Sequence, residues 1–267
     1  MRLHTAVVKN SEVGMDSKSS VQQQFGPVAT HYATSAVHAG GPDLAGMIQA
    51  VTLRGDERVL DAGCGAGHTA LAFAPHVAEV VAVDLTLAML TQVRRLAKER
   101  GLANVVAVRG DVEKLQFPDN SFDLVTTRYS AHHWPRPAAA MQEFARVLKP
   151  GGTLLLVDVV APPAPLPDTF LNTIELLRDP SHVRDHSAAQ WQAMMEAAGF
   201  AAEFIGQWPL FLEFESWVAR MNTPFLSITQ IRTLIEGAPQ EVREALLLTE
   251  GSYSFTVPVA LLRAQRG

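Results

Sequence analysis

The stretch VLDAGCGAG, residues 59–67, runs from apolar residues into a loop rich in glycine. It predicts a buried β-strand that turns directly into a helix, which we expect in HTALAFAPHV (68–77). Glycine tolerates positive φ and lets a backbone approach a ligand closely, and the first turn of a helix carries unpaired N–H groups. The stretch therefore predicts a ligand site between a strand and a helix.

Four further apolar runs follow, separated by helical segments such as AMLTQVRRLAKERG (88–101) and AAAMQEFARVLKPGG (138–152). The runs are VVAVDL (80–85), NVVAVRGD (104–111), FDLVTTRYS (122–130) and TLLLVDVV (153–160). Buried strands that alternate with helices predict a parallel sheet covered on both faces, which is the doubly wound, Rossmann-like α/β architecture.

Acidic residues end the first three of these predicted strands. Asp61 precedes the glycine loop, Asp84 ends the second strand, and Asp111 follows Gly110 after the third. A carboxylate in the second position can accept hydrogen bonds from ribose hydroxyls, and one in the third can accept from an adenine amine. Together the three acids predict a site for an adenine nucleoside at the switch point of the sheet.

The loop alone leaves the identity of that nucleoside open. GAGHTA (65–70) fits the dinucleotide pattern G-x-G-x-x-A, and Asp84 follows at a suitable spacing, so an NAD(P)-linked oxidoreductase is an alternative. Against it, Asp61 would face a pyrophosphate badly and suits a cationic ligand better. A protein that binds such a cofactor without catalysis is a third interpretation.

Composition limits the class of protein further. The chain has 267 residues, a formal charge of -5, 48% hydrophobic residues and one cysteine, so an internal disulfide is excluded and a reducing, cytoplasmic setting is expected. The acidic balance disfavours a nucleic-acid partner. The N-terminus has no apolar signal region, and no apolar run is long enough to cross a membrane.

We expect four segments along the chain. Residues 1–20 are predicted to be a mobile tail, and 21–55 a helical arm, interrupted at Gly26-Pro27, that acts as a lid. Residues 56–160 form the cofactor-binding core. In the remainder, 161–267, APPAPLP (161–167) predicts a stiff linker. A mostly helical substrate-cap insert, at about 208–250, precedes a last strand in FTVPVALL (255–262).

Four motifs in succession carry a family resemblance. VLDAGCGAG (59–67), VVAVDLTLAML (80–90), VRGDVEKLQFPDNSFDLV (108–125) and VLKPGGTLLLVD (147–158) resemble the motifs of class I S-adenosylmethionine-dependent methyltransferases. They look most like the branch that contains the ubiquinone/menaquinone C-methyltransferases and their small-molecule relatives. The resemblance implies S-adenosylmethionine as cofactor and a seven-stranded sheet whose last strand is antiparallel.

The resemblance also implies a role for each matching residue. Asp61, Gly63 and Gly65 would lie against the methionine part of the cofactor, with Gly67 closing the turn. Asp84 would hold the ribose, and Leu85 would pack on the adenine. Asp111 and Val112 would meet the adenine edge, and Arg128 would lie near the methionine end of the cofactor. Tyr32 would belong to the N-terminal segment that folds over the cofactor.

Two departures from known methyltransferase patterns bear on the acceptor. TTRYSAHHW (126–134) stands where the quinone enzymes have an Asn-rich segment, which argues against a quinone. The N/D-P-P-Y/F segment of nucleic-acid base methylases is absent. We therefore expect a small-molecule acceptor, direct in-line transfer without a metal, and a monomer or homodimer.

Two adjacent histidines, His132 and His133, are the candidate catalytic residues. We expect them to point in different directions, with one, preferably His133, facing the acceptor as a base that titrates near pH 6.5. The other would pack or cap the next turn. A metal pair is disfavoured because no further ligand cluster is visible nearby. His182 and His186 have metal-ligand spacing on a helix, but we expect them to be surface residues.

Overall fold

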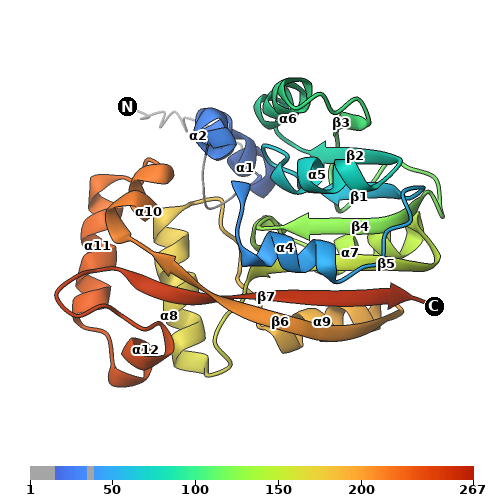
Figure 1. Cartoon of the computed structure of the whole chain (residues 1–267). Coiled ribbons are helices and arrows are strands. Elements are labelled where there is room, and N and C mark those ends of the chain that lie inside the picture. The colour runs from blue at the N-terminus through green and yellow to red at the C-terminus, as the bar shows by residue number, and fades with distance from the viewer. Residues whose placement is uncertain (1–15, 35–38) are drawn as a thin grey trace, which may run out of the picture.

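The computed structural model of the chain describes residues 16–34 and 39–267 and has a single seven-stranded sheet (Figure 1). The strand order is β3-β2-β1-β4-β5-β7-β6, and β7 is antiparallel to both of its neighbours. This confirms the predicted fold class, including the antiparallel last strand. The strands are β1 (Arg58–Ala62), β2 (Glu79–Asp84), β3 (Val105–Arg109), β4 (Phe122–Arg128), β5 (Leu148–Val159), β6 (Phe200–Leu212) and β7 (Phe255–Arg266).

Helices lie on both faces of the sheet and beyond one end of it (Figure 1). In chain order they are α1 (Ser17–Phe25), α2 (Ala29–Thr34), α4 (Pro42–Gln49), α5 (His68–Phe73), η1 (Ala74–His76), α6 (Leu87–Glu99), η2 (Ala131–His133), α7 (Pro137–Val147), α8 (Pro165–Arg178), α9 (Ala188–Ala197), α10 (Phe214–Arg220), α11 (Phe225–Glu236) and α12 (Gln240–Ala245). The segments η1 and η2 are single 3₁₀ turns.

The two faces of the sheet are buried by different helices. On one face α4, α5 and α6 pack through side chains such as Met47, Phe73 and Val93. On the other, α7 and α9 pack through Phe144 and Trp191. Since both faces are covered, the central strands are apolar in continuous runs rather than in alternation, as the sequence of β2 shows.

The carboxyl ends of β1, β2 and β4 all point to the side on which α1, α2, α8 and α10 lie (Figure 1). Helices α8, α10, α11 and α12 and the far ends of β6 and β7 share a separate apolar cluster, which includes Leu171, Trp217 and Phe255. Added elements thus surround the end of the sheet where parallel α/β folds place their ligands.

The prediction of a stiff linker at residues 161–167 is wrong for the second half of that segment. Pro165 and Pro167 begin helix α8, with Pro165 as its first residue, instead of continuing an extended chain. Proline is accepted in the first turn of a helix because the N–H it lacks would have no partner there. The sequence analysis therefore missed a 14-residue helix.

The N-terminal arm begins earlier than expected. Most of the predicted tail lies outside the described residues, but Ser17–Phe25 is helical, and Asp16 caps it by accepting a hydrogen bond from the Ser19 N–H at 2.7 Å. The predicted break at Gly26-Pro27 separates α1 from α2.

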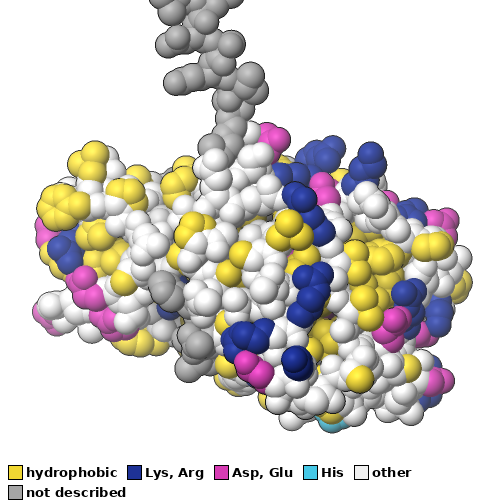
Figure 2. Space-filling model, turned by 90° about the horizontal axis from the view of Figure 1, so that it is seen from above, with side chains coloured by type: hydrophobic (Ala, Val, Ile, Leu, Met, Phe, Trp, Pro, Cys, Tyr) yellow, Lys and Arg dark blue, Asp and Glu magenta, His cyan; other side chains and the backbone are white. Residues whose placement is uncertain are grey.

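One face of the molecule shows how its surface is divided (Figure 2). Hydrophobic side chains gather at the left and again toward the right of this view. Among the exposed hydrophobic residues are Phe225 and Leu226 of α11. Lys and Arg side chains form a band nearer the middle. Within residues 16–34 and 39–267, no helix combines the length and the apolar character needed to cross a membrane.

Candidate active site

A cavity opens at the carboxyl ends of β1, β2 and β4, beneath α1 and α2. Nine of the predicted site residues line it. They are Tyr32, Gly63, Gly65, Asp84, Leu85, Asp111, Val112, Arg128 and His133. Asp61, Gly67 and His132 do not line it.

The glycine loop has the backbone that its sequence predicts. Gly63 and Gly65 have φ of 70° and 51°, values that favour glycine. A Cβ at Gly63 would lie 2.0 Å from the Ser130 hydroxyl, whereas one at Gly65 would meet open space. Gly67 is the N-cap of α5, also at positive φ. The loop thus leaves its backbone uncovered beside the cavity.

Asp61 holds this loop through both of its carboxylate oxygens. One carboxylate oxygen accepts a hydrogen bond from the Ala70 N–H at 2.9 Å, in the first turn of α5, and the other accepts from the Thr126 hydroxyl at 3.2 Å. Burial raises its pKa to about 7. The expected contact of Asp61 with the methionine part of the cofactor remains a prediction, since each carboxylate oxygen keeps a second lone pair.

Asp84 joins the glycine loop to the next strand end. Its two oxygens accept hydrogen bonds from the N–H groups of Gly65 at 2.9 Å and Thr86 at 2.8 Å. Burial raises the pKa of this carboxyl. Each oxygen has a second lone pair with which it can accept another hydrogen bond, so Asp84 can bind a diol in the cavity.

Asp111 and Val112 also line the first cavity. Asp111 has a partner from the N-terminal arm that the sequence analysis did not predict. The ammonium of Lys18 in α1 contacts Asp111 and lies 2.6 Å from Glu113. In the same helix, the Gln22 amide donates to the Leu85 carbonyl at 2.9 Å. These contacts hold α1 across the cavity, and nothing local in the sequence indicated them.

Arg128 forms a buried ion pair that the sequence analysis missed. Its Nε lies 2.5 Å from Asp43 of α4, and both side chains are almost fully buried. Its guanidinium also lies 4.7 Å from the ring centre of Tyr129. Tyr129 has a left-handed backbone, with φ of 51°, a conformation that is uncommon outside glycine and is often found at functional sites. Asp43 fixes an arginine at the cavity wall.

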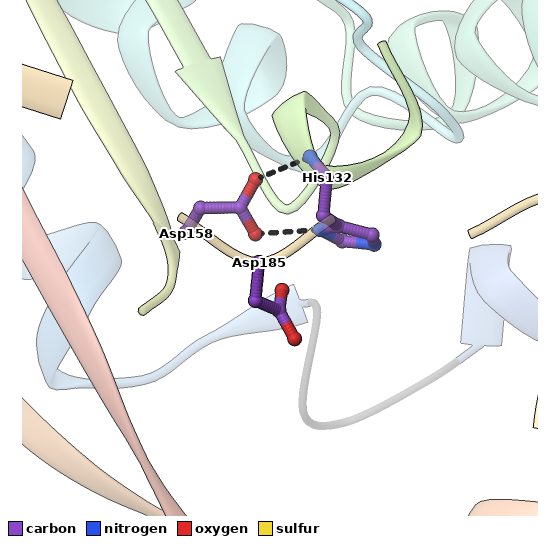
Figure 3. A group of neighbouring side chains, drawn as sticks. All are labelled: His132, Asp158 and Asp185. Carbon is purple, nitrogen blue, oxygen red and sulfur yellow. Dashed lines mark hydrogen bonds and ion pairs between the residues drawn. The ribbon is translucent and has the colours of Figure 1, made fainter. Parts of the chain in front are cut away.

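His132 is held by a carboxylate that is distant in sequence (Figure 3). Its Nδ1 lies 2.7 Å from Asp158 Oδ1, and its backbone N–H donates to Oδ2 at 3.2 Å. Burial lowers the imidazole pKa, but the charge and the hydrogen bond of Asp158 outweigh this and raise it to about 9. His132 is therefore protonated at neutral pH.

His133, in contrast to His132, is neutral at neutral pH. Its Nδ1 lies 3.0 Å from the Ser181 carbonyl oxygen, so Nδ1 carries the hydrogen and Nε2 the lone pair. Burial, and then the positive charge on His132, lower its pKa. The expectation of a base that titrates near pH 6.5 is therefore wrong for both rings, because their environments shift them apart.

The two imidazoles also do not diverge as predicted. Both belong to the turn η2, and their ring centres are only 4.2 Å apart. Adjacent residues of a 3₁₀ turn lie about 120° apart around its axis, whereas those of an extended strand point to opposite faces, so the two rings can approach each other here. Their different jobs come from their partners, Asp158 and Ser181, rather than from their directions.

Asp185 completes a group of possible metal ligands with His132 and Asp158, whose ligand atoms all lie within 4.8 Å of one another. The sequence analysis saw no such group because the three residues are far apart in the chain. Asp158, however, already accepts from the Ala131, His132 and Val159 N–H groups as well as from the imidazole. Its lone pairs are therefore committed, which favours an orienting carboxylate over a metal ligand. The absence of a metal remains a prediction.

His182 and His186 are not surface residues, contrary to expectation. The segment 182–187 is not helical, His182 is buried, and its Nε2 lies 3.1 Å from the Asn172 side-chain oxygen. His186 is partly buried and its ring lies 5.0 Å from that of Trp191. Helix α8, which the sequence analysis missed, supplies Asn172 and covers His182.

A second cavity adjoins the first and shares four of its lining residues: Phe25, Tyr32, Tyr129 and His133. The rest of its wall is formed by His132, Val159, Glu175, Arg178, Asp179, Asp185, Leu210, Leu212, Trp217 and Arg220. Tyr32, at the junction, donates from its hydroxyl to the Met221 sulfur at 3.1 Å. The C-terminal helices thus add a chamber next to the end of the sheet.

Comparisons with known proteins agree with this architecture. A family model described as a methyltransferase domain matches residues 60–156. The uncharacterised methyltransferase YcgJ of Bacillus subtilis is 44% identical over 225 residues, which cover 84% of this chain and 89% of that protein. The crystal structure of YcgJ has a TM-score of 0.81 at 42% identity, and the match covers 84% of this chain and 97% of that one.

The likeness to quinone-modifying enzymes is shorter. The ubiquinone/menaquinone biosynthesis C-methyltransferase UbiE of Azotobacter vinelandii is 40% identical over 114 residues, which cover 41% of this chain and 45% of that enzyme. The chain belongs to the class I S-adenosylmethionine-dependent methyltransferases. It is therefore an enzyme of the methyl-transfer class, and the NAD(P)-linked alternative is excluded.

Proposed function

We propose that the chain binds S-adenosylmethionine in the first cavity and transfers its methyl group to a small molecule held in the second. The observation that carries this proposal is the junction of the two cavities at Phe25, Tyr32, Tyr129 and His133. A methyl group at that junction would be accessible from both sides, as direct in-line transfer requires.

The residues of the first cavity suit this cofactor. Bound S-adenosylmethionine supplies an electrophilic methyl group on a sulfonium. Gly65 provides an uncovered backbone, Asp84 can accept from ribose hydroxyls, and Leu85 and Val112 offer apolar contact. Asp111, which lines this cavity and contacts Lys18, would accept from the adenine amine.

The arm would exclude water and align the reactants. Phe25 of α1 packs edge-on against His133, with ring centres 4.9 Å apart, and against Tyr32 at 5.4 Å. Holding the acceptor and the methyl group in line lowers the barrier by several kcal/mol through positioning alone.

His133 is the base that the geometry favours. It lines both cavities, it is neutral at neutral pH, and Ser181 fixes the tautomer that leaves a lone pair on Nε2. His132, protonated and bound to Asp158, keeps a positive charge beside it. That charge would stabilise the anionic form of an acceptor, while the same charge lowers the proton affinity of His133.

Cofactor binding is tested by calorimetry with S-adenosylhomocysteine and, separately, NAD. We expect S-adenosylhomocysteine to bind and NAD not to bind. Asp84→Ala should weaken binding by about 1–3 kcal/mol, because it removes a buried acceptor. The matched control is Asp119→Ala, an exposed acid outside both cavities. Unchanged affinity in Asp84→Ala would remove the ribose assignment.

Transfer is tested with methyl-labelled S-adenosylmethionine and a cell extract separated into small-molecule and macromolecular fractions. Label should enter the small-molecule fraction. His133→Gln should slow its entry by roughly 10²–10⁴-fold and leave cofactor affinity intact, while His186→Gln serves as the control. Label confined to macromolecules would contradict a small-molecule acceptor, and an unchanged rate in His133→Gln would contradict the base.

A further inference from the structure

The second cavity has an arginine that no acid neutralises. Arg220 is the last residue of α10 and is partly buried in the cavity wall. Across residues 16–34 and 39–267, no side chain or carbonyl forms a hydrogen bond or ion pair with it. Burial, and then the charge of Arg178, lower its pKa. A partly desolvated guanidinium without a partner is stabilised when a ligand supplies the counter-charge.

A second guanidinium is fixed beside it. Arg178 of α8 donates from Nε to the Trp217 carbonyl at 3.0 Å, lies 3.1 Å from Glu175, and stacks 5.0 Å from the Trp217 ring centre. These contacts leave Arg178 little freedom to move. The cavity therefore has one rigid arginine, already paired, and one unpaired arginine.

The three acids that line the cavity are occupied elsewhere. Glu175 is paired with Arg178. Asp179 accepts from the N–H and the hydroxyl of Ser181, at 2.8 and 2.7 Å. Burial raises the pKa of Asp185 well above its usual range, and this carboxyl lies in the group with His132 and Asp158. None of them supplies the missing charge at Arg220.

We propose that the acceptor carries a carboxylate or phosphate group and that Arg220 binds this group. The inference rests on the proposed function, because it places the acceptor in the second cavity. Guanidinium groups bind such anions through two parallel hydrogen bonds. Val159, Leu210 and Leu212 would contact an apolar body between Arg220 and His133. The acceptor class is thus a small organic acid with its nucleophilic atom remote from the acidic group.

The test is an NMR titration of the full chain, with and without S-adenosylhomocysteine, that follows the Nε–H signals of arginine side chains. The probes are inorganic phosphate, benzoate and, as a neutral analogue, benzamide, at constant ionic strength. The Arg220 signal, assigned with Arg220→Gln, should shift saturably with phosphate or benzoate and not with benzamide. Which anion binds more tightly distinguishes a phosphorylated from a carboxylated acceptor.

Two variants complete the design. Arg220→Gln should weaken binding of the anion by about tenfold or more, the scale of a lost charged hydrogen bond. The anion affinity of Arg220→Lys should lie between those of the native chain and Arg220→Gln, because lysine keeps the charge without the paired donors. Neither should change affinity for S-adenosylhomocysteine, since Arg220 does not line the first cavity. An Arg220 signal that moves no more than that of Arg95, which is exposed and paired with Glu99, would overturn the proposal. So would unchanged anion affinity in Arg220→Gln. Failure of S-adenosylhomocysteine to bind would instead refute the proposed function.

Discussion

Asp158 determines the charge of both candidate catalytic histidines. It accepts from His132 directly, and burial of His133, together with the positive charge stabilised on His132, keeps His133 neutral. Burial and one acid therefore separate two chemically identical side chains into a cation and a base. This division of labour resembles other sites in which neighbouring titratable groups are shifted in opposite directions.

Asp158→Asn should lower the His132 pKa well below about 9, because burial is then opposed only by the smaller effects of the Asp185 and Glu175 charges. The measurement is an NMR titration of the His132 ring. Asp123→Asn, which removes an acid paired with Lys149 away from both cavities, should leave the titration unchanged. A midpoint that stays near 9 in Asp158→Asn would mean that another group holds the proton.

The same shift makes stability depend on pH. The folded pKa of His132 lies above its unfolded value of about 6.5, so its contribution is fully present below pH 6.5. It is lost as the pH rises through about 9. The shift corresponds to roughly 3 kcal/mol as an upper limit. The free energy of unfolding, measured with denaturant between these pH values, should fall with rising pH in the native chain and not in Asp158→Asn.

At the scale of elements, the second cavity is built from helices added to the sheet. Phe25 comes from α1, Tyr32 from α2, Arg178 from α8 and Trp217 from α10. The strand ends line the first cavity. The added helices must therefore determine which acceptor shapes fit the second cavity. Function is commonly placed on a fold in this way.

Hydrogen exchange should show this division. Adding S-adenosylhomocysteine should slow amide exchange in α1 and α2, which the contacts of Lys18 and Gln22 draw over the first cavity. We expect protection of about tenfold or more, because local opening of the arm then requires loss of the ligand. Helices α10 and α8 should gain protection when an organic acid is added as well.

Helix α7 is the internal control, since it packs on a face of the sheet away from both cavities. Protection limited to the sheet and α7, with α1 and α2 unchanged, would contradict the role of the arm as a lid.

At the scale of the whole molecule, the apolar clusters of the sheet and of the C-terminal helices are joined by β6 and β7, which extend through both. These two strands pair over nearly their full length, from Phe200 to Leu212. Ligand binding at the sheet end should therefore stabilise the chain as a unit.

S-adenosylhomocysteine at about 100 times its Kd should raise the free energy of unfolding by about 2.7 kcal/mol. For a chain of this size the melting temperature should rise by about 5–10 °C. NAD at the same concentration should produce no shift, and Asp84→Ala should reduce the shift that S-adenosylhomocysteine produces. The melting temperature can be measured by calorimetry or fluorescence. Equal shifts with both ligands would contradict the cofactor assignment.

Local patterns in the chain were enough to predict the core. Glycines that require positive φ, apolar runs of strand length and acids at strand ends predicted the sheet and its ligand site, and the family resemblance implied the antiparallel last strand and further residues that line the first cavity. These features could be read because each depends on neighbouring residues: on backbone sterics, on burial of a strand on both faces and on where a strand ends.

Only the tertiary structure decided which groups meet. Asp43 with Arg128, Asp158 with His132, and Lys18 with Asp111 are pairs whose members lie 85, 26 and 93 residues apart, and no local pattern links them. Helix α8 was hidden by its prolines, although proline is compatible with a first helical turn. The charges of the histidines and the unpaired guanidinium of Arg220 depend on burial and on such distant partners. A sequence gives the identity of each group, but the packed chain sets its distance to other charges and its exposure to water, and these determine its pKa and what it can bind.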